Sequence, residues 1–416
     1  MVAVEIPLTF PHSTHHAAAP NPLQPKEGII VNSTATTHPV INWSEDGEAR
    51  SARWRSESGN PPPKRVVIAD DQITADAAYR LACEGTAMLW RGDFQNAKQL
   101  LQALARRAER KPRKKAGKSE AVASSSSEAF HRHRLAQSQR ARTLAMLLLP
   151  LEADYSVALR RAPDLRQACE EAYGPADCPG PSVVSLREVL GLIGAHEWRK
   201  KGVSIPALGD RIYPHYGVFA PIRGEYVGLV AEAPLPAQTL AFDIGTGTGV
   251  LAALLARRGV ARIVATDQDP RALACAHENI ARLGLAEQVE VMEADLFPTG
   301  RAPLVVCNPP WLPARPSSPL ESAIYDPDSR MLRGFLNGLA AHLTPEGEGW
   351  LLLSDLAEHL GLRSRAELLA AFDAAGLQVI GRSDVRPAHP RASDTTDPLH
   401  AARAAEVTSL WRLAAR

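Results

Sequence analysis

The sequence has few cysteines and no long apolar run. Its five cysteines form no Cys-x-x-Cys pair and are not spaced with histidines as in a zinc site. This pattern argues against a zinc centre and against a disulfide framework, and it is expected of a protein in a reducing cytosol. No apolar run reaches the ~18 residues of a membrane span, and the first residues lack the basic and apolar regions of a secretion signal. We therefore expect a soluble, cytoplasmic protein with no metal and no membrane partner.

Net charge is also nearly absent, so it says little about partners. Lys and Arg number 47 against 46 Asp and Glu, and only a local cluster could attract a nucleic acid. One cluster, the basic segment, spans residues 105–142 with twelve basic and three acidic residues. It could follow a phosphate backbone, or it could be a solvated basic linker near residues 106–134. Phe130 is its one aromatic residue, so a stacking platform for single strands is not expected.

A chain of 416 residues predicts two or three domains. Residues 1–62 are rich in Pro, Thr, Ser, Asn and Ala without periodicity, and we expect a disordered tail there. Residues 63–205 are expected to form a mainly helical N-terminal domain, residues 206–235 an arm, and residues 236–416 a catalytic domain. In the N-terminal domain one predicted helix carries Leu81, Met88 and Leu89 on one face. Further helices are predicted at residues 97–108, 144–149, 155–172 and 183–200.

The heptapeptide Asp243 to Gly249 (Asp-Ile-Gly-Thr-Gly-Thr-Gly) is the centre of the predicted catalytic domain. It follows an apolar run and precedes a helical one, which indicates a strand, a glycine turn and a helix. Alternating glycines let the backbone approach a ligand where a Cβ would collide. The spacing differs from the dinucleotide fingerprint G-x-G-x-x-G. An aspartate before the first glycine would repel a pyrophosphate but can hold an ammonium group.

Strands and helices alternate after this turn, which predicts an α/β domain with a parallel sheet and helices on both faces. The second strand ends at Asp267, 24 residues after Asp243, where an acid suits a ribose diol. A further strand leads to Asp295, and the strand at residues 303–307 runs into Asn308-Pro-Pro-Trp311. The ligand is expected beyond the carboxyl ends of these strands.

Together these motifs resemble the class I S-adenosylmethionine-dependent methyltransferases, over roughly residues 210–416. The Asn-Pro-Pro-aromatic tetrapeptide resembles their amino-methylating branch, which includes the release-factor glutamine, ribosomal-RNA guanine-N2 and adenine-N6 enzymes. The resemblance implies a Rossmann-like seven-stranded sheet that ends in an antiparallel hairpin. It also implies S-adenosyl-L-methionine as the cofactor.

The resemblance assigns roles to individual residues. For the cofactor it implies a methionine site, a ribose carboxylate and an adenine site, formed by Asp243, Gly245, Thr246, Gly247, Gly249, Asp267, Asp295, Leu296 and Asn308. Asp269 is expected instead to cap the next helix at Pro270. For the acceptor it implies that the Asn308 side-chain oxygen and the Pro309 carbonyl accept the N–H groups of a planar nitrogen. Pro310 stiffens the loop, and Trp311 offers a face for stacking.

The arm before the glycine turn is similar to a Pro-Arg-acid segment of the glutamine-directed enzymes. The match is loose, because Ile222 separates Pro221 from Arg223. An arm so placed would pass over the cofactor pocket, so we expect Phe219, Arg223 and Glu225 to contact a ligand. Glu225 could equally be a surface charge.

These features predict a methyltransferase that acts on a planar amide or exocyclic amino nitrogen of a protein or RNA, ribosome-associated substrates included. Two alternatives stay open. One is a methyltransferase-like module that binds nucleic acid or protein without catalysis, and the other is a small-molecule methyltransferase. The glycine spacing excludes an NAD-type dehydrogenase, and that hypothesis would also leave the tetrapeptide without a role.

Overall fold

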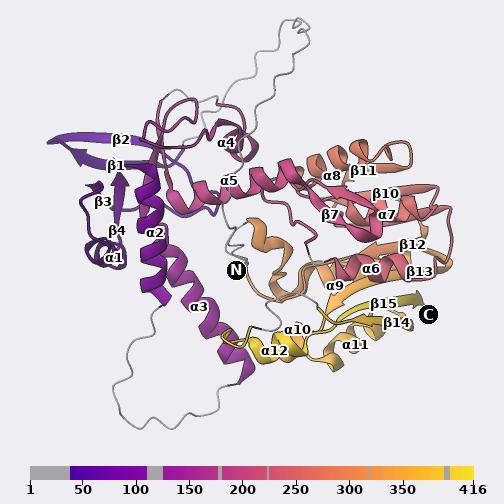
Figure 1. Ribbon diagram of the computed structural model, residues 1–416. Helices are drawn as coiled ribbons and strands as arrows, with labels where there is room; N and C mark the ends of the chain where they lie inside the picture. The colour runs from indigo at the N-terminus through magenta and orange to yellow at the C-terminus, as the bar shows by residue number, and fades with distance from the viewer. Residues whose placement is uncertain (1–37, 110–124, 177–179, 223, 317–318, 388–393) are drawn as a thin grey trace, which may run out of the picture.

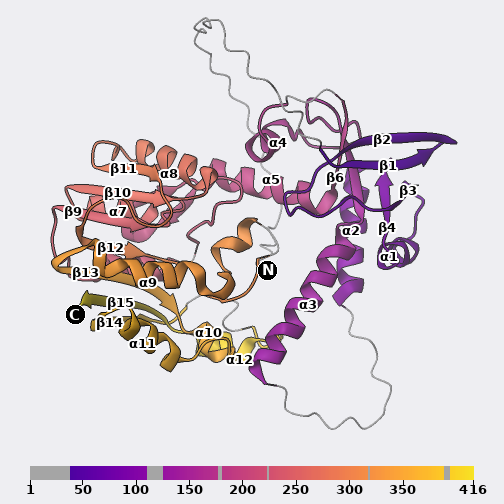
Figure 2. The same cartoon turned by 180° about the vertical axis from the view of Figure 1, so that it is seen from behind.

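The computed structural model describes residues 38–109, 125–176, 180–222, 224–316, 319–387 and 394–416. Within these ranges the chain forms a six-stranded sheet in its N-terminal half and a seven-stranded sheet in its C-terminal half (Figure 1). In the same ranges, no helix combines the length and apolar character needed to cross a membrane. The two halves lie side by side in both views (Figure 2).

The N-terminal sheet has the strand order β1-β2-β6-β5-β4-β3. Its strands are β1 (Val40–Glu45), β2 (Glu48–Trp54), β3 (Arg65–Ala69), β4 (Thr86–Trp90), β5 (Leu147–Leu151) and β6 (Ser182–Ser185). Strands β3, β4 and β5 are parallel, and β6 is antiparallel to β5 and parallel to β2. The helices of this half are α1 (Ala75–Cys83), α2 (Phe94–Glu109), α3 (Ser126–Leu144), α4 (Arg166–Tyr173) and α5 (Leu186–Lys201).

The expectation of a mainly helical N-terminal domain is therefore wrong, because this half is α/β. Met88 and Leu89, predicted on one helical face, lie on strand β4, and they pack into different apolar clusters on its two faces. The predicted helix at residues 144–149 is replaced by the end of α3 and by strand β5. Both strands are almost wholly buried. A short strand buried on both faces has a continuous apolar run, which periodicity cannot distinguish from a buried helix.

The expected tail at residues 1–62 is also wrong in part. Residues 1–37 lie outside the described ranges, but β1 and β2 form a hairpin. Asp46 and Gly47 connect the strands with φ of 55° and 81°. An Asp-Gly pair with two positive φ angles is a typical hairpin turn, and this signal was available in the sequence.

Along the chain, the two sheets are separated by β7 (Val203–Ile205), a short 3-10 turn (Pro206–Leu208), β8 (Asp210–Ile212) and α6 (Glu225–Glu232). The C-terminal half, which the motifs predict to be catalytic and which is called the catalytic half below, continues with β9 (Leu240–Ile244), α7 (Val250–Arg257), β10 (Arg262–Asp267), α8 (Pro270–Arg282), β11 (Val289–Glu293), β12 (Ala302–Cys307), α9 (Arg330–His342), β13 (Leu343–Ser354), α10 (Leu356–His359), α11 (Arg365–Ala374), β14 (Leu377–Val385), α12 (His400–Ala405) and β15 (Thr408–Ala415).

The catalytic sheet confirms the predicted architecture. Among the described residues its order is β11-β10-β9-β12-β13-β15-β14. Strands β9 to β13 are parallel, and β15 is antiparallel to β13 and β14. Successive residues Ala241 and Phe242 of β9 pack into separate apolar clusters, so helices cover both faces. The strand order reverses between β9 and β12, which is the crevice where ligands bind in such sheets.

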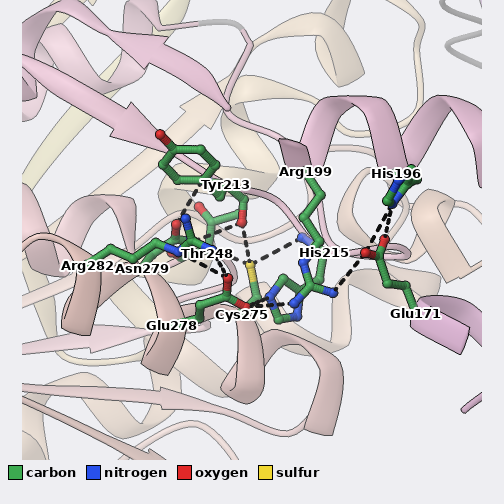
Figure 3. A network of polar contacts seen from close by, with 10 residues as sticks. All are labelled: Glu171, His196, Arg199, Tyr213, His215, Thr248, Cys275, Glu278, Asn279 and Arg282. Carbon is green, nitrogen blue, oxygen red and sulfur yellow. Dashed lines mark hydrogen bonds and ion pairs between the residues drawn. The ribbon is translucent and has the colours of Figure 1, made fainter. Parts of the chain in front are cut away.

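A polar network ties α8 to the segment before the catalytic sheet and to α5 (Figure 3). The Glu278 carboxylate lies 2.7 Å from both Arg199 Nη2 and His215 Nε2. Asn279, which is buried, donates from Nδ2 to the carbonyls of Tyr213 and Thr248 at 3.2 and 3.1 Å. Because Thr248 belongs to the glycine turn, this network couples the turn to the chain that leads to Phe219.

Candidate functional site

The glycine turn links β9 to α7 and contains three glycines with positive φ. Gly245, Gly247 and Gly249 have φ of 71°, 56° and 80°, a backbone conformation that residues other than glycine rarely adopt. A Cβ on Gly249 would also lie 3.4 Å from the Cα of Ala276 on α8. The turn therefore requires glycine at these positions, and α7 begins directly after Gly249.

Asp243 lies beneath this turn. Its Oδ2 accepts hydrogen bonds from the Thr246 hydroxyl at 2.7 Å and from the Ala252 N–H at 3.1 Å. The residue is 1% exposed, and burial raises the pKa of its carboxyl to about 6. Asp243 is not among the residues that line the cavity described below, so the structure shows it fixing the turn. Its contact with a ligand ammonium stays a prediction.

Asp267 lies at the carboxyl end of β10, next to the turn. Its Oδ2 accepts from the Gly247 N–H and its Oδ1 from the Asp269 N–H, each at 3.0 Å. Burial raises the pKa of this carboxyl, while these hydrogen bonds oppose the shift. Asp269 accepts from the Arg271 N–H at 2.9 Å and is the N-cap of α8, as predicted.

The Asn-Pro-Pro-Trp loop leaves the neighbouring strand β12. Trp311 Nε1 donates to Asn308 Oδ1 over 3.0 Å. The following chain pairs Leu312 with Tyr325 in an isolated bridge, which closes a loop beyond the tetrapeptide. The tetrapeptide is therefore held at the carboxyl edge of the sheet.

A cavity of about 580 Å³ joins the two motifs. Of the predicted site residues, its wall contains Phe219, Gly245, Thr246, Gly247, Asp267, Asn308, Pro309, Pro310 and Trp311. Residues more than ninety positions apart in the sequence thus line one space.

Other predicted site residues lie elsewhere. Gly249 packs against α8, and Glu225 begins α6, so neither is among the lining residues of the cavity. The Asp295 carboxylate is largely exposed, bonded to Gln268 and 3.8 Å from Arg330. Leu296 packs against the apolar cluster under α9 with φ of 72°. Arg223 lies outside the described residues.

Several lining residues were not predicted from the sequence. Glu321, Tyr325 and Glu406 belong to the catalytic half, and Arg134 and Gln137 come from α3 of the N-terminal half. Glu321 and Glu406 are only 6% and 2% exposed. No local motif marks these residues, because they reach the cavity through the tertiary packing of distant segments.

Comparison with known proteins connects this half of the chain to methyltransferases. Residues 230–309 match the family model for ribosomal protein L11 methyltransferase (PrmA). The chain is 34% identical over 178 residues to the release factor glutamine methyltransferase of Cereibacter sphaeroides, an alignment that covers 39% of this chain and 63% of the relative. It is 28% identical over 183 residues to the tRNA1(Val) (adenine(37)-N6)-methyltransferase of Shewanella loihica, covering 41% of this chain and 72% of the relative.

A further relative, the ribosomal protein L11 methyltransferase of Pelotomaculum thermopropionicum, is 48% identical over 69 residues, 16% of this chain and 22% of the relative. The chain therefore spans less than two thirds of the length of the release-factor and L11 relatives. By its strand order and by these likenesses, the C-terminal half of the chain has the Rossmann-like α/β fold of the S-adenosylmethionine-dependent methyltransferases and is similar to them in sequence.

Proposed function

We propose that the protein is a cytoplasmic S-adenosylmethionine-dependent N-methyltransferase whose acceptor is a planar nitrogen of a protein or an RNA. One observation carries this proposal. The glycine turn with Asp267 and the Asn-Pro-Pro-Trp loop line the same cavity at the point where the strand order reverses. A cofactor site and an acceptor site must share such a space for a direct transfer.

The residues at the turn suit this cofactor. Gly245 and Gly247 have no Cβ to block close approach, and the start of α7 favours a carboxylate. The Asp267 carboxylate is held by two backbone N–H groups, and each oxygen has a further lone pair for a ribose hydroxyl. S-adenosylmethionine would supply an electrophilic methyl group when bound.

The tetrapeptide positions the acceptor. An amide or exocyclic amino nitrogen is a poor nucleophile, because its lone pair is delocalised into a π-system. The Asn308 side-chain oxygen and the Pro309 carbonyl would accept its N–H groups and favour a pyramidal nitrogen with the lone pair directed at the methyl group. Pro309 and Pro310 donate no N–H that could compete for these bonds. Positioning of this kind lowers the activation free energy by several kcal/mol.

The names of the relatives favour an acceptor in the translation apparatus, because they refer to a release factor, to ribosomal protein L11 and to a tRNA. The basic segment gives RNA little separate support. Arg134 and Arg140 form ion pairs with Glu321 and Glu109, and residues 110–124 lie outside the described ranges.

Calorimetric titration with S-adenosylmethionine, followed by transfer of radiolabelled methyl groups into cell extract, tests the proposal. Label lost on protease treatment identifies a protein acceptor, and label lost on RNase treatment identifies RNA. Asn308→Ala should leave cofactor affinity nearly intact and lose at least about a hundredfold in kcat. Cofactor binding without any transfer by the wild type would instead identify a non-catalytic binding module.

A further inference from the structure

Helix α3 of the N-terminal half reaches across to the catalytic half. In both views it runs from the side of the six-stranded sheet toward α10 and α12 (Figures 1 and 2). Phe130, near its start, is 2% exposed and is buried in one apolar cluster with Leu312, Tyr325, Leu356 and Leu360. This cluster includes both ends of the bridge that follows the Asn-Pro-Pro-Trp loop, so α3 is docked beside that loop.

One turn later, Arg134 fixes the same contact by polar interactions. Its Nη1 lies 3.2 Å from Glu321 Oε2, and its Nη2 donates to the Arg315 carbonyl at 2.6 Å. The guanidinium carbon also lies 4.0 Å from the centroid of the Tyr325 ring. Because Glu321 is almost fully buried, removal of Arg134 would weaken the compensation of its charge. The position of α3 relative to the Asn-Pro-Pro-Trp loop is therefore well defined.

The same face of α3 forms part of the cavity wall. His133, Arg134, Gln137, Ser138 and Ala141 all line the cavity that contains Asn308 and Trp311. Their spacing of three and four residues places them on one side of the helix. The N-terminal half thus contributes directly to the space in which an acceptor would lie.

The polar groups that α3 leaves for a ligand are uncharged. Arg134 is engaged by Glu321 and Tyr325, and Arg403, a lining residue from α12, is paired with Asp397 at 2.7 Å. Burial lowers the pKa of His133, which favours the neutral imidazole. Among the described residues, the Gln137 amide and the Ser138 hydroxyl make no side-chain hydrogen bond to the protein, although both line the cavity.

We propose that α3 is the acceptor-selecting element, in which Gln137 and Ser138 bind the edge of an uncharged planar group that carries both hydrogen-bond donors and acceptors. This inference rests on the proposed function and adds to it a residue-level role for the N-terminal half. A phosphate or another anionic group would be poorly matched, because the arginines among the described lining residues are already paired.

Gln137→Ala tests the inference, with Gln139→Ala as the matched control. Gln139 lies two residues away on the same helix but is exposed and outside the cavity wall. Cofactor affinity is measured by calorimetry, and the transfer rate is measured with labelled S-adenosylmethionine and total cell extract. We expect Gln137→Ala to keep cofactor affinity within twofold and to slow transfer about tenfold, the equivalent of one lost hydrogen bond. Gln139→Ala should change neither. Equal transfer rates for the two variants would overturn the inference.

A second pair of variants tests the same inference without relying on the loss of a single hydrogen bond. Leu135 lines the cavity and is 55% exposed, so Leu135→Trp should fold and narrow the space for the acceptor. Ala136→Trp adds the same bulk at an exposed neighbouring position outside the wall. Slower transfer by Leu135→Trp alone, with cofactor affinity unchanged in both, supports the inference. A wild type that binds no cofactor or transfers no label overturns the proposed function and this inference with it, whereas an active wild type with unaffected α3 variants overturns this inference alone.

Discussion

The indole N–H of Trp311 donates to the side-chain oxygen of Asn308, over 3.0 Å. An indole nitrogen can only donate, so this bond fixes which end of the Asn308 amide is the oxygen. The oxygen has a second lone pair, which stays available for an acceptor N–H. Trp311 is therefore expected to position Asn308 as well as to offer a stacking surface.

Trp311→Phe separates these two roles, because phenylalanine keeps an aromatic face and lacks the donor. We expect cofactor affinity to be unchanged and kcat to fall about five- to tenfold, since the Asn308 amide loses a bond worth ~1 kcal/mol. Steady-state kinetics and calorimetry measure the two effects. Trp43→Phe is the control, because it removes an indole hydrogen bond to Glu45 in the N-terminal hairpin, and Trp43 is not among the residues that line the cavity. A Trp311→Phe enzyme with normal kcat would assign Trp311 to stacking alone.

Asp267→Ala should weaken S-adenosylmethionine binding by ~1–3 kcal/mol, because a carboxylate that lines the cavity would lose its bonds to the ribose. Asp295→Ala is the informative comparison. The sequence motif predicts an adenine contact for Asp295, but the side chain is 71% exposed and outside the cavity wall, so we expect a smaller loss. Dissociation constants of S-adenosylmethionine, measured by calorimetry for both variants, test this difference. A loss at Asp295 as large as that at Asp267 would support the role implied by the motif.

The sequence predicted the catalytic half well because its signals are local. Strands β9, β10 and β12 lead into motifs with their own chemistry, at Asp243, Asp267 and Asn308, and helices of ordinary length follow β9 and β10. The short N-terminal strands carry no such signal. Thr86–Trp90 and Leu147–Leu151 are mostly apolar, so the sequence pattern does not distinguish a strand from a helix there. They are strands because the folded sheet buries both of their faces. The part of α3 in the cavity could not be predicted, because Arg134 meets Glu321 across 187 positions of sequence.

Asp243→Asn probes the buried carboxyl beneath the glycine turn. Burial raises its pKa to about 6 in the folded state, from the ordinary 3.8. The folded protein then binds more protons than the unfolded chain between these values, so this group's contribution to stability falls as pH rises through that window. Asparagine has no such titration and keeps an oxygen acceptor for the Thr246 hydroxyl. Relative to wild type, Asp243→Asn should therefore gain roughly 2 kcal/mol in unfolding free energy between pH 4 and pH 7. Denaturant unfolding of both proteins across this range measures the difference, and a difference independent of pH would place the carboxyl in a solvated setting.

The hairpin β1–β2 gives a prediction that separates a folded strand from a tail. Ile41 is 1% exposed and packs with Trp54 and Leu89 in the cluster on one face of the N-terminal sheet, whereas the adjacent Val40 is 50% exposed. Ile41→Ala should cost about 2–5 kcal/mol of stability, the usual range for a buried isoleucine. Val40→Ala removes an apolar side chain one position away and should cost well under 1 kcal/mol. Thermal or denaturant unfolding compares the two variants. Equal, small losses would mean that residues 40–54 contribute no core to the sheet. We expect removal of residues 1–60 to destabilise the N-terminal half, because it deletes two of the six strands.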